Sequence, residues 1–144
     1  MMAKQISVFL ENKAGRLARV TRVLGEAGIN IRALSIADTS DFGILRIIVN
    51  DPESAYRILK EGGFTVSETD VIAVRVPDTP GGLAGVLEAT SAANLNIEYL
   101  YAFIGSSGKD ALVIFKVEDV EQAAATFTAA GIEFLDDQSL YNFS

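Results

Sequence analysis

The hydrophobic positions in the first half of the chain change their spacing several times, and each change predicts a new element. Residues 6–11 form a short β-rich segment, whereas Leu17, Val20, Leu24 and Ala27 recur at the spacing of one helical face. This helix is expected to end at Gly28 and to be followed by a strand over 29–38, a turn over 38–43 and a buried strand over 44–49. A second helix then begins at Asp51-Pro52 and ends at Gly62-Gly63, and a strand over 64–76 follows it.

The second half of the chain repeats this pattern. Leu17 corresponds to Leu83 and Gly15 to Gly81, both at an offset of 66 in the numbering. The offset grows to 67 where residues 44–49 align with 111–116, and to 68 near Gly131. Such drift is typical of insertions in the loops between the elements of a repeat.

The repeat predicts the elements of the second half. They are strands over 71–77, 95–104, 111–117 and 132–136, helices over 82–93 and 119–130, and a turn over 105–110. Residues 138–143 lie 68 positions after 70–75, which suggests one extra strand at the end of the chain.

Each half therefore has the order β-α-β-β-α-β, the ferredoxin-like arrangement, in which helices cover one face of an antiparallel sheet. The sequence predicts an α+β protein of two tandem units, one over residues 1–70 and the other over 71–144. Units of about 70 residues bury a smaller fraction of their surface than a 150-residue domain, so each gains stability by packing against another unit.

The amino-acid composition argues against several classes of function. The net charge of −7 argues against nucleic-acid and anionic-membrane surfaces, which need clustered Lys and Arg. The chain has no cysteine and no histidine, which removes thiolate chemistry, the commonest general base and the commonest metal ligand. No signal-peptide pattern and no apolar run of membrane-spanning length is evident. We expect a cytoplasmic protein that is not an enzyme and holds no cofactor and no metal.

Two stretches carry a resemblance to a known family. Residues 11–31, ENKAGRLARVTRVLGEAGINI, and 77–97, PDTPGGLAGVLEATSAANLNI, each place Asn or Asp, then Gly-x-Leu, before a helix that ends in x-Asn-Ile. In a βαββαβ unit that fills half of the chain, this pattern resembles the ACT domain, a regulatory module that binds amino acids. The resemblance covers both halves and implies a stand-alone tandem ACT protein. It further implies a free amino acid effector, a homodimer and a regulated metabolic enzyme as partner.

The resemblance also implies the binding residues. In ACT domains the ligand is held where two units meet, by the loop after the first strand and by the strand after the first helix. The corresponding positions here are Asn12, Ala14, Gly15, Arg16 and Leu17 in the first repeat, Asp78, Pro80, Gly81, Gly82 and Leu83 in the second, and the pair Asn30 and Asn96. Ala14 stands where the second repeat has Pro80, so the two sites are expected to differ.

The chemistry of this corner suits a zwitterion. A helix N-terminus offers unpaired N–H groups to a carboxylate, and glycine allows a ligand to approach the main chain closely. Asp78 can hold an ammonium group, Asn12 can accept a hydrogen bond from one, and Asn30 and Asn96 can both donate and accept.

Structural roles are the alternative for the same residues. The glycines can serve only to shape the turn from strand to helix, with Asn12 and Asp78 as caps or turn formers. Asn30 and Asn96 can take left-handed geometry after a helix. Two other functions also stay open. One is a protein–protein interaction module of the same fold with no bound ligand, and the other is an enzyme, since this fold hosts many chemistries.

Overall fold

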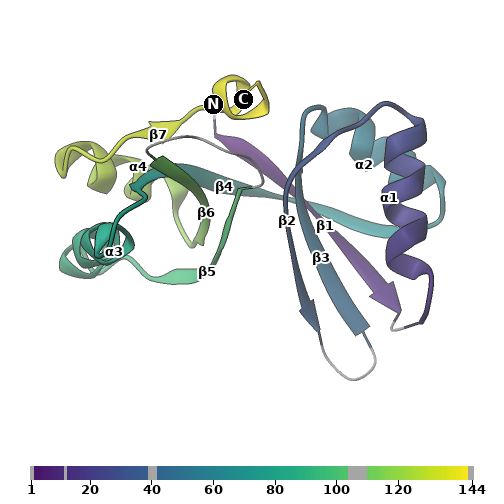
Figure 1. Cartoon of the computed structure of the whole chain (residues 1–144), viewed down its shortest axis with the longest axis horizontal. Helices are drawn as coiled ribbons and strands as arrows, with labels where there is room; N and C mark the ends of the chain where they lie inside the picture. Colours follow the sequence, from purple (N-terminus) through teal and green to yellow (C-terminus); the bar gives the residue numbers. More distant parts are fainter. Residues whose placement is uncertain (1, 12, 39–41, 104–109, 143–144) are drawn as a thin grey trace. The chain divides into compact units, whose positions relative to one another are not determined.

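The chain forms two compact units, Lys4–Thr69 and Asp70–Ser144, the second including Met1–Ala3 (Figure 1). The structure, a computed structural model, describes residues 2–11, 13–38, 42–103 and 110–142. A 13-residue strand, β4 (Thr65–Pro77), contributes its first residues to one unit and the rest to the other. The domain boundary expected between residues 70 and 71 falls within this strand.

The first unit is a βαββαβ unit, as the sequence predicts. Its elements are β1 (Ala3–Glu11), α1 (Arg16–Glu26), β2 (Ile31–Asp38), β3 (Phe42–Val49), α2 (Pro52–Glu61) and the start of β4. Strands β2, β3 and β1 are antiparallel neighbours in that order, and β4 follows β1. Helices α1 and α2 lie side by side and cover one face of this sheet (Figure 1).

The core of the first unit lies between the two helices and the sheet. Val20 and Leu24 of α1 and Leu59 of α2 are fully buried against strand residues such as Ile6 and Ile47. Leu17, which the helical spacing places on the same face, is 38% exposed, because it belongs to the first turn of α1, at the rim of the sheet. The second helix begins as predicted: Asp51 is its N-cap and accepts a hydrogen bond from the Ser54 main-chain N–H.

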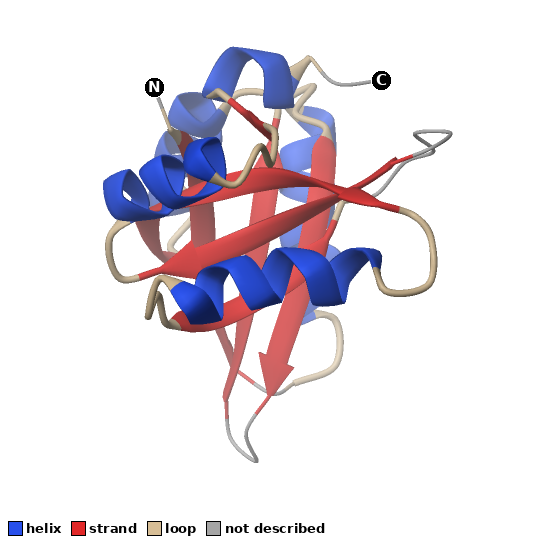
Figure 2. Ribbon diagram, turned by 90° about the vertical axis from the view of Figure 1, so that its left-hand side faces the viewer, coloured by secondary structure: helices blue, strands red, loops and turns tan. Residues whose placement is uncertain are grey.

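The second unit repeats the arrangement. It contains the rest of β4, α3 (Gly82–Ala92), β5 (Ile97–Ala102), β6 (Asp110–Val117), α4 (Val120–Ala129), β7 (Phe134–Leu135) and α5 (Asp137–Tyr141). Strand β4 lies between β6 and β7, and β5 pairs with β6 on its other side. Helices α3 and α4 lie against one face of these strands, in front of them in Figure 2. The rings of Phe115 and Phe127 meet edge to face in the core at a centroid distance of 5.9 Å.

Strand register corrects the predicted alignment of the repeats. Phe9 lies opposite Ile44, and Arg75, which corresponds to Phe9 at an offset of 66, lies opposite Leu112. Ile44 therefore corresponds to Leu112 at an offset of 68, so the intermediate offset of 67 is wrong. Leu34 and Leu100 still correspond at 66 on the preceding strands, because they oppose the equivalent residues Ile47 and Phe115. The whole change of offset thus falls in the connection that joins β5 to β6.

The end of the chain differs from prediction. Residues 137–141 form α5 in place of the extra strand expected over 138–143, and residue 143 lies outside the described part. The carboxylate of Asp136 caps this helix by accepting from the Ser139 N–H, and Leu140 is fully buried, so one cap and one apolar anchor fix a short helix here. Strand β7 covers only Phe134–Leu135, which is shorter than the strand expected over 132–136. Within the described residues, none of the helices combines the length and the apolar character that crossing a lipid bilayer requires.

Candidate functional site

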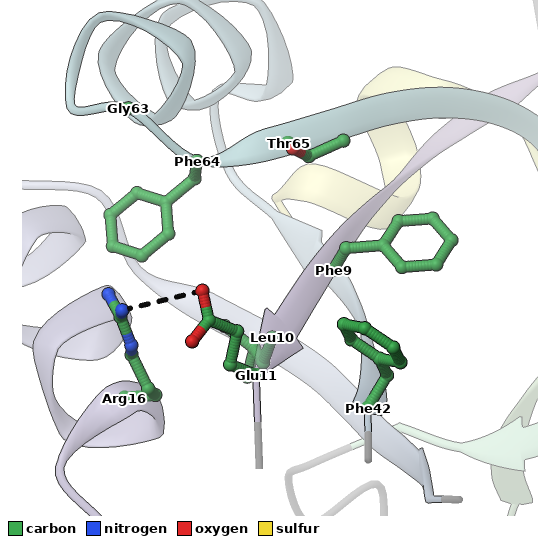
Figure 3. A pocket seen from close by; sticks show the side chains of 8 residues that line it. All are labelled: Phe9, Leu10, Glu11, Arg16, Phe42, Gly63, Phe64 and Thr65. Atoms are coloured by element: carbon green, nitrogen blue, oxygen red, sulfur yellow. Dashed lines mark ion pairs between the residues drawn. The ribbon is translucent and has the colours of Figure 1, made fainter. Parts of the chain in front are cut away.

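The first unit has a pocket of about 390 Å³ at the corner where β1 ends and α1 begins (Figure 3). The start of β3 and the connection from α2 to β4 complete its wall. Its lining consists of Phe9, Leu10, Glu11, Arg16, Phe42, Gly63, Phe64 and Thr65. This volume is at the lower end of the range for small-molecule sites, about 300 to 1,000 Å³, and suits a ligand the size of an amino acid.

Opposite charges lie together in this pocket. The Glu11 carboxylate lies 3.0 Å from the Lys13 Nζ. It also lies 3.6 Å from an Arg16 guanidinium nitrogen, the ion pair drawn in Figure 3. The hydrogen bond and charge of Lys13, with the charge of Arg16, hold the pKa of Glu11 below its usual value. A third cation is close, since the Arg19 guanidinium lies 5.2 Å from the centre of the Phe64 ring. The pocket therefore presents an ionised carboxylate within a cluster of cations.

Aromatic rings line another side of the same pocket. Glu11 lies directly opposite Phe42 in the β1–β3 pairing, and Phe9 is two positions before Glu11, so these three side chains share one face of the sheet. Figure 3 shows the rings of Phe9 and Phe42 on the side of Glu11 away from Arg16. Phe9 and Phe42 are 50% and 54% exposed, which leaves half of each ring open to a ligand.

The main-chain geometry of the turn at this corner explains why a glycine precedes the helix in each repeat. Gly15 is the N-cap of α1 with a φ of 88°, and Gly81 is the N-cap of α3 with a φ of 83°. Residues with a Cβ rarely adopt this left-handed geometry. Neither helix has a side-chain cap, which contradicts the alternative that Asp78 caps the second helix and leaves its alternative role as a turn former. The repeated glycine where each helix begins is thus required by the main chain itself.

The equivalent corner of the second unit holds a pocket of about 400 Å³. Its lining consists of Arg75, Pro77, Gly82, Gly85, Val86, Ala89, Asp110, Ala130, Gly131, Ile132 and Glu133. Arg75 and Glu133 form an ion pair of 3.1 Å within it. Gly82 occupies the position of Arg16, and a Cβ built on it would overlap the Pro77 carbonyl oxygen. The second corner therefore has no room for a side chain where the first carries a guanidinium.

Comparison with known proteins assigns the family. A protein-family model described as an ACT domain pair matches residues 1–144. The chain belongs to the ACT domain pair family. A solved structure, protein BT0572 from Bacteroides thetaiotaomicron, is 42% identical, with a TM-score of 0.93 over 99% of this chain and 98% of that one.

Two further structures share the fold of this ACT domain pair. The regulatory subunits of aspartate kinase from Thermus thermophilus and Thermus flavus are 20% and 19% identical, with TM-scores of 0.68 and 0.65. The matches cover 90% and 91% of this chain and 92% of each of those chains. No curated protein matches the chain.

The ACT domain pair places two of the predicted site residues in the pockets: Arg16 in the first and Gly82 in the second. Asn12 lies outside the described residues. The other loop positions lie at the exposed surface, in the turns or first helical turns beside the pockets rather than among their lining residues: Ala14, Gly15, Leu17, Asp78, Pro80, Gly81 and Leu83. The predicted loops thus border both pockets but supply one lining residue to each.

Asn30 and Asn96 are both exposed and line neither pocket. The main-chain N–H of Asn30 donates to the Asn50 side chain, and its carbonyl accepts from the Asn50 N–H. The expectation of left-handed geometry at this pair is wrong, because among the described non-glycine residues Asn94 is the one with positive φ, at 55°. Asn94 corresponds to Gly28 in the first repeat, two positions earlier than the pair.

Sequence reasoning missed most of the lining of the first pocket. Apolar residues alternate along segment 6–11 with Ser7, Phe9 and Glu11, which share the other face of the strand; of these three, Phe9 and Glu11 are exposed and Ser7 is buried. An aromatic residue on this face was the available signal for Phe9. Phe42 and Phe64 have no such signal, because only the fold brings β3 and the α2–β4 connection to the end of β1. Across the described part of the chain, no three acidic residues gather in a way that could hold a metal ion.

Proposed function

We propose that this ACT domain pair is a regulatory protein without catalytic activity that binds a free amino acid at one or both of the corners where the first strand of a unit meets its first helix. One observation carries the proposal: each unit has a pocket of amino-acid size at this same corner. The ion pair of Glu11 and Arg16 in the first corner offers a partner to each charged group of an amino acid.

Binding can regulate only if the ligand has different affinities for two states of the protein or of its complexes. We propose that the regulated partner is a metabolic enzyme. The support is the fold shared with regulatory subunits of aspartate kinase, whose chains match this one over 92% of their length. A homodimer, a contribution of two units to each ligand site and a cytoplasmic location belong to the same proposal.

Thermal unfolding of the full chain against each of the twenty amino acids tests this function. A ligand at one hundred times its dissociation constant adds about 2.7 kcal/mol to the free energy of unfolding. For a protein of this size that raises the melting temperature by about 5 to 10 °C. The D-enantiomer of the amino acid with the largest effect is the control and should give a smaller shift. A panel without any shift would contradict the proposal.

A pattern of exposed leucines favours a second candidate, a protein–protein interaction module with no ligand. Leu17 and Leu83 are each 38% exposed, and Leu34 and Leu100 are 39% and 38% exposed. These residues form two pairs at the same offset of 66, so both repeats keep apolar side chains at the same surface positions. Light scattering with and without amino acids separates the two candidates. An interaction module of this kind forms assemblies whose stability is the same under both conditions.

A further inference from the structure

The two corners occupy equivalent places but carry different charges. The first corner is lined by Glu11 and Arg16, whose charges cancel, and the ammonium group of Lys13 beside Glu11 adds a positive charge. The second corner is lined by Arg75, Asp110 and Glu133, so its charge is negative by one unit. A ligand carboxylate is attracted to the first set of charges and repelled by the second.

The first corner also has unused bonding capacity. A guanidinium has five N–H donors in a fork that matches a carboxylate, and one Glu11 oxygen at 3.6 Å cannot occupy them all. A carboxylate has about four acceptor sites, so Glu11 can take an ammonium group in addition to Lys13. Arg16 and Glu11 thus offer complementary partners for the carboxylate and the ammonium group of one α-amino acid.

The remaining space defines the ligand side chain. Phe9 and Phe42 leave half of their surface open on the sheet face that also carries Glu11 (Figure 3). An apolar side chain placed there covers both rings, and an aromatic one can also stack on them or meet them edge to face. The second pocket is lined instead by small and aliphatic residues such as Gly85, Ala89 and Ile132 and offers no aromatic ring.

We propose that the first corner is the amino acid site of this protein and that its ligand is an α-amino acid with an aromatic or large aliphatic side chain. Arg16 holds the ligand carboxylate, Glu11 holds the ammonium group, and Phe9 and Phe42 cover the side chain. The second corner does not take part. This inference rests on the proposed function and specifies both its site and its ligand class.

Isothermal titration calorimetry of the full chain tests the ligand class. L-phenylalanine should bind at least about tenfold more tightly than L-aspartate, because the carboxylate side chain of aspartate gains nothing from two aromatic rings. 3-Phenylpropionate, which lacks the ammonium group, should bind at least about tenfold more weakly than L-phenylalanine. Tighter binding of aspartate, or of any small or polar amino acid, would overturn the inference and leave the proposed function in place.

Variants test the site. Arg16→Met should weaken L-phenylalanine binding at least about tenfold, since it removes a charge-assisted contact. Arg22→Met changes the same residue type on the exposed side of the same helix and should leave binding unchanged. Circular dichroism confirms that both variants fold.

A third variant, Arg75→Met, probes the second corner and should also leave binding unchanged. If Arg75→Met loses binding while Arg16→Met keeps it, the assignment of the ligand to the first corner is overturned. The assignment is also overturned if neither variant alters binding. If no amino acid binds at all, the proposed function fails together with the inference.

Discussion

Gly82 is the first residue of α3, and the main chain of β4 passes very close to it. An added Cβ would overlap the Pro77 carbonyl oxygen and would come within 3.3 Å of the Pro77 Cβ. Pro77 is held in the sheet, opposite Asp110 of β6, so its carbonyl cannot move away without disturbing the strand pairing. Gly82→Ala must therefore shift either the helix or the strand.

Overpacking of this kind costs about 1 to 3 kcal/mol. The main chain of β4 cannot give way as a flexible side chain would, so we expect a loss of about 2 to 3 kcal/mol at Gly82. Gly85 is the matched control, because it lies in the same helix and an added Cβ meets no atom within 4 Å. There alanine should stabilise the protein by about 0.5 to 1 kcal/mol, since it restricts the unfolded chain more than glycine does.

Urea and thermal unfolding followed by circular dichroism measure both effects. A change of about 1 kcal/mol shifts the melting temperature by about 2 to 4 °C at this size. Gly82→Ala should thus melt about 4 to 12 °C below the wild type, and Gly85→Ala a few degrees above it. If Gly82→Ala is as stable as Gly85→Ala, the close approach of β4 and α3 is not present in solution and the reasoning fails.

Three other predictions test the fold and the proposed assembly. Hydrogen bonds from the side chain and main chain of Ser54 lower the pKa of Asp51 in the folded protein. Asp51 therefore stabilises the fold above its unfolded pKa of about 3.9, and this stabilisation is lost as the pH falls through the lower folded pKa. Asp51→Asn should make the free energy of unfolding fall less steeply with decreasing pH in the acid range, and an unchanged slope would contradict this. Leu24→Ala should cost about 2 to 5 kcal/mol because Leu24 is fully buried, whereas Leu17→Ala, at 38% exposure, should cost less than about 1.5 kcal/mol in the same urea titration; equal costs would refute the core assignment. Leu34→Glu places a charge on the exposed side of an edge strand and should halve the mass of the proposed homodimer in multi-angle light scattering; a dimer that persists excludes this edge as its interface.

Local signals were sufficient for the two helices of the first unit and their ends. Asp51-Pro52 predicts a helix start, and Asp51 is indeed the N-cap with Pro52 in the first turn. The regular spacing of Val20 and Leu24 predicts their burial, because a helix of this period presents one face to a sheet. The chain end shows the limit of such signals: a repeat offset predicts a strand over 138–143, but the local cap at Asp136 produces α5.

Loop positions in the candidate site were harder to interpret. For Gly15 and Gly81 the sequence allows both close approach of a ligand and a role in shaping the turn, and their left-handed φ values give them the turn-shaping role, which needs no ligand. The sequence could not separate these roles, because both require the same residue. Arg16 of the predicted loop lines the first pocket, and so does Glu11, with which it pairs but which is not among the predicted residues.

The sequence by itself determined the repeat, the βαββαβ order of each unit and the family, because these depend on spacing and on short motifs that recur along the chain. The tertiary structure decided which side chains share a pocket. Phe9, Phe42 and Phe64 lie far apart in the sequence, and only strand pairing and the return of the chain after α2 bring them around Glu11 and Arg16. Such contacts depend on register and on packing between distant elements, and a slip of the register by a single position would turn every strand side chain to the opposite face.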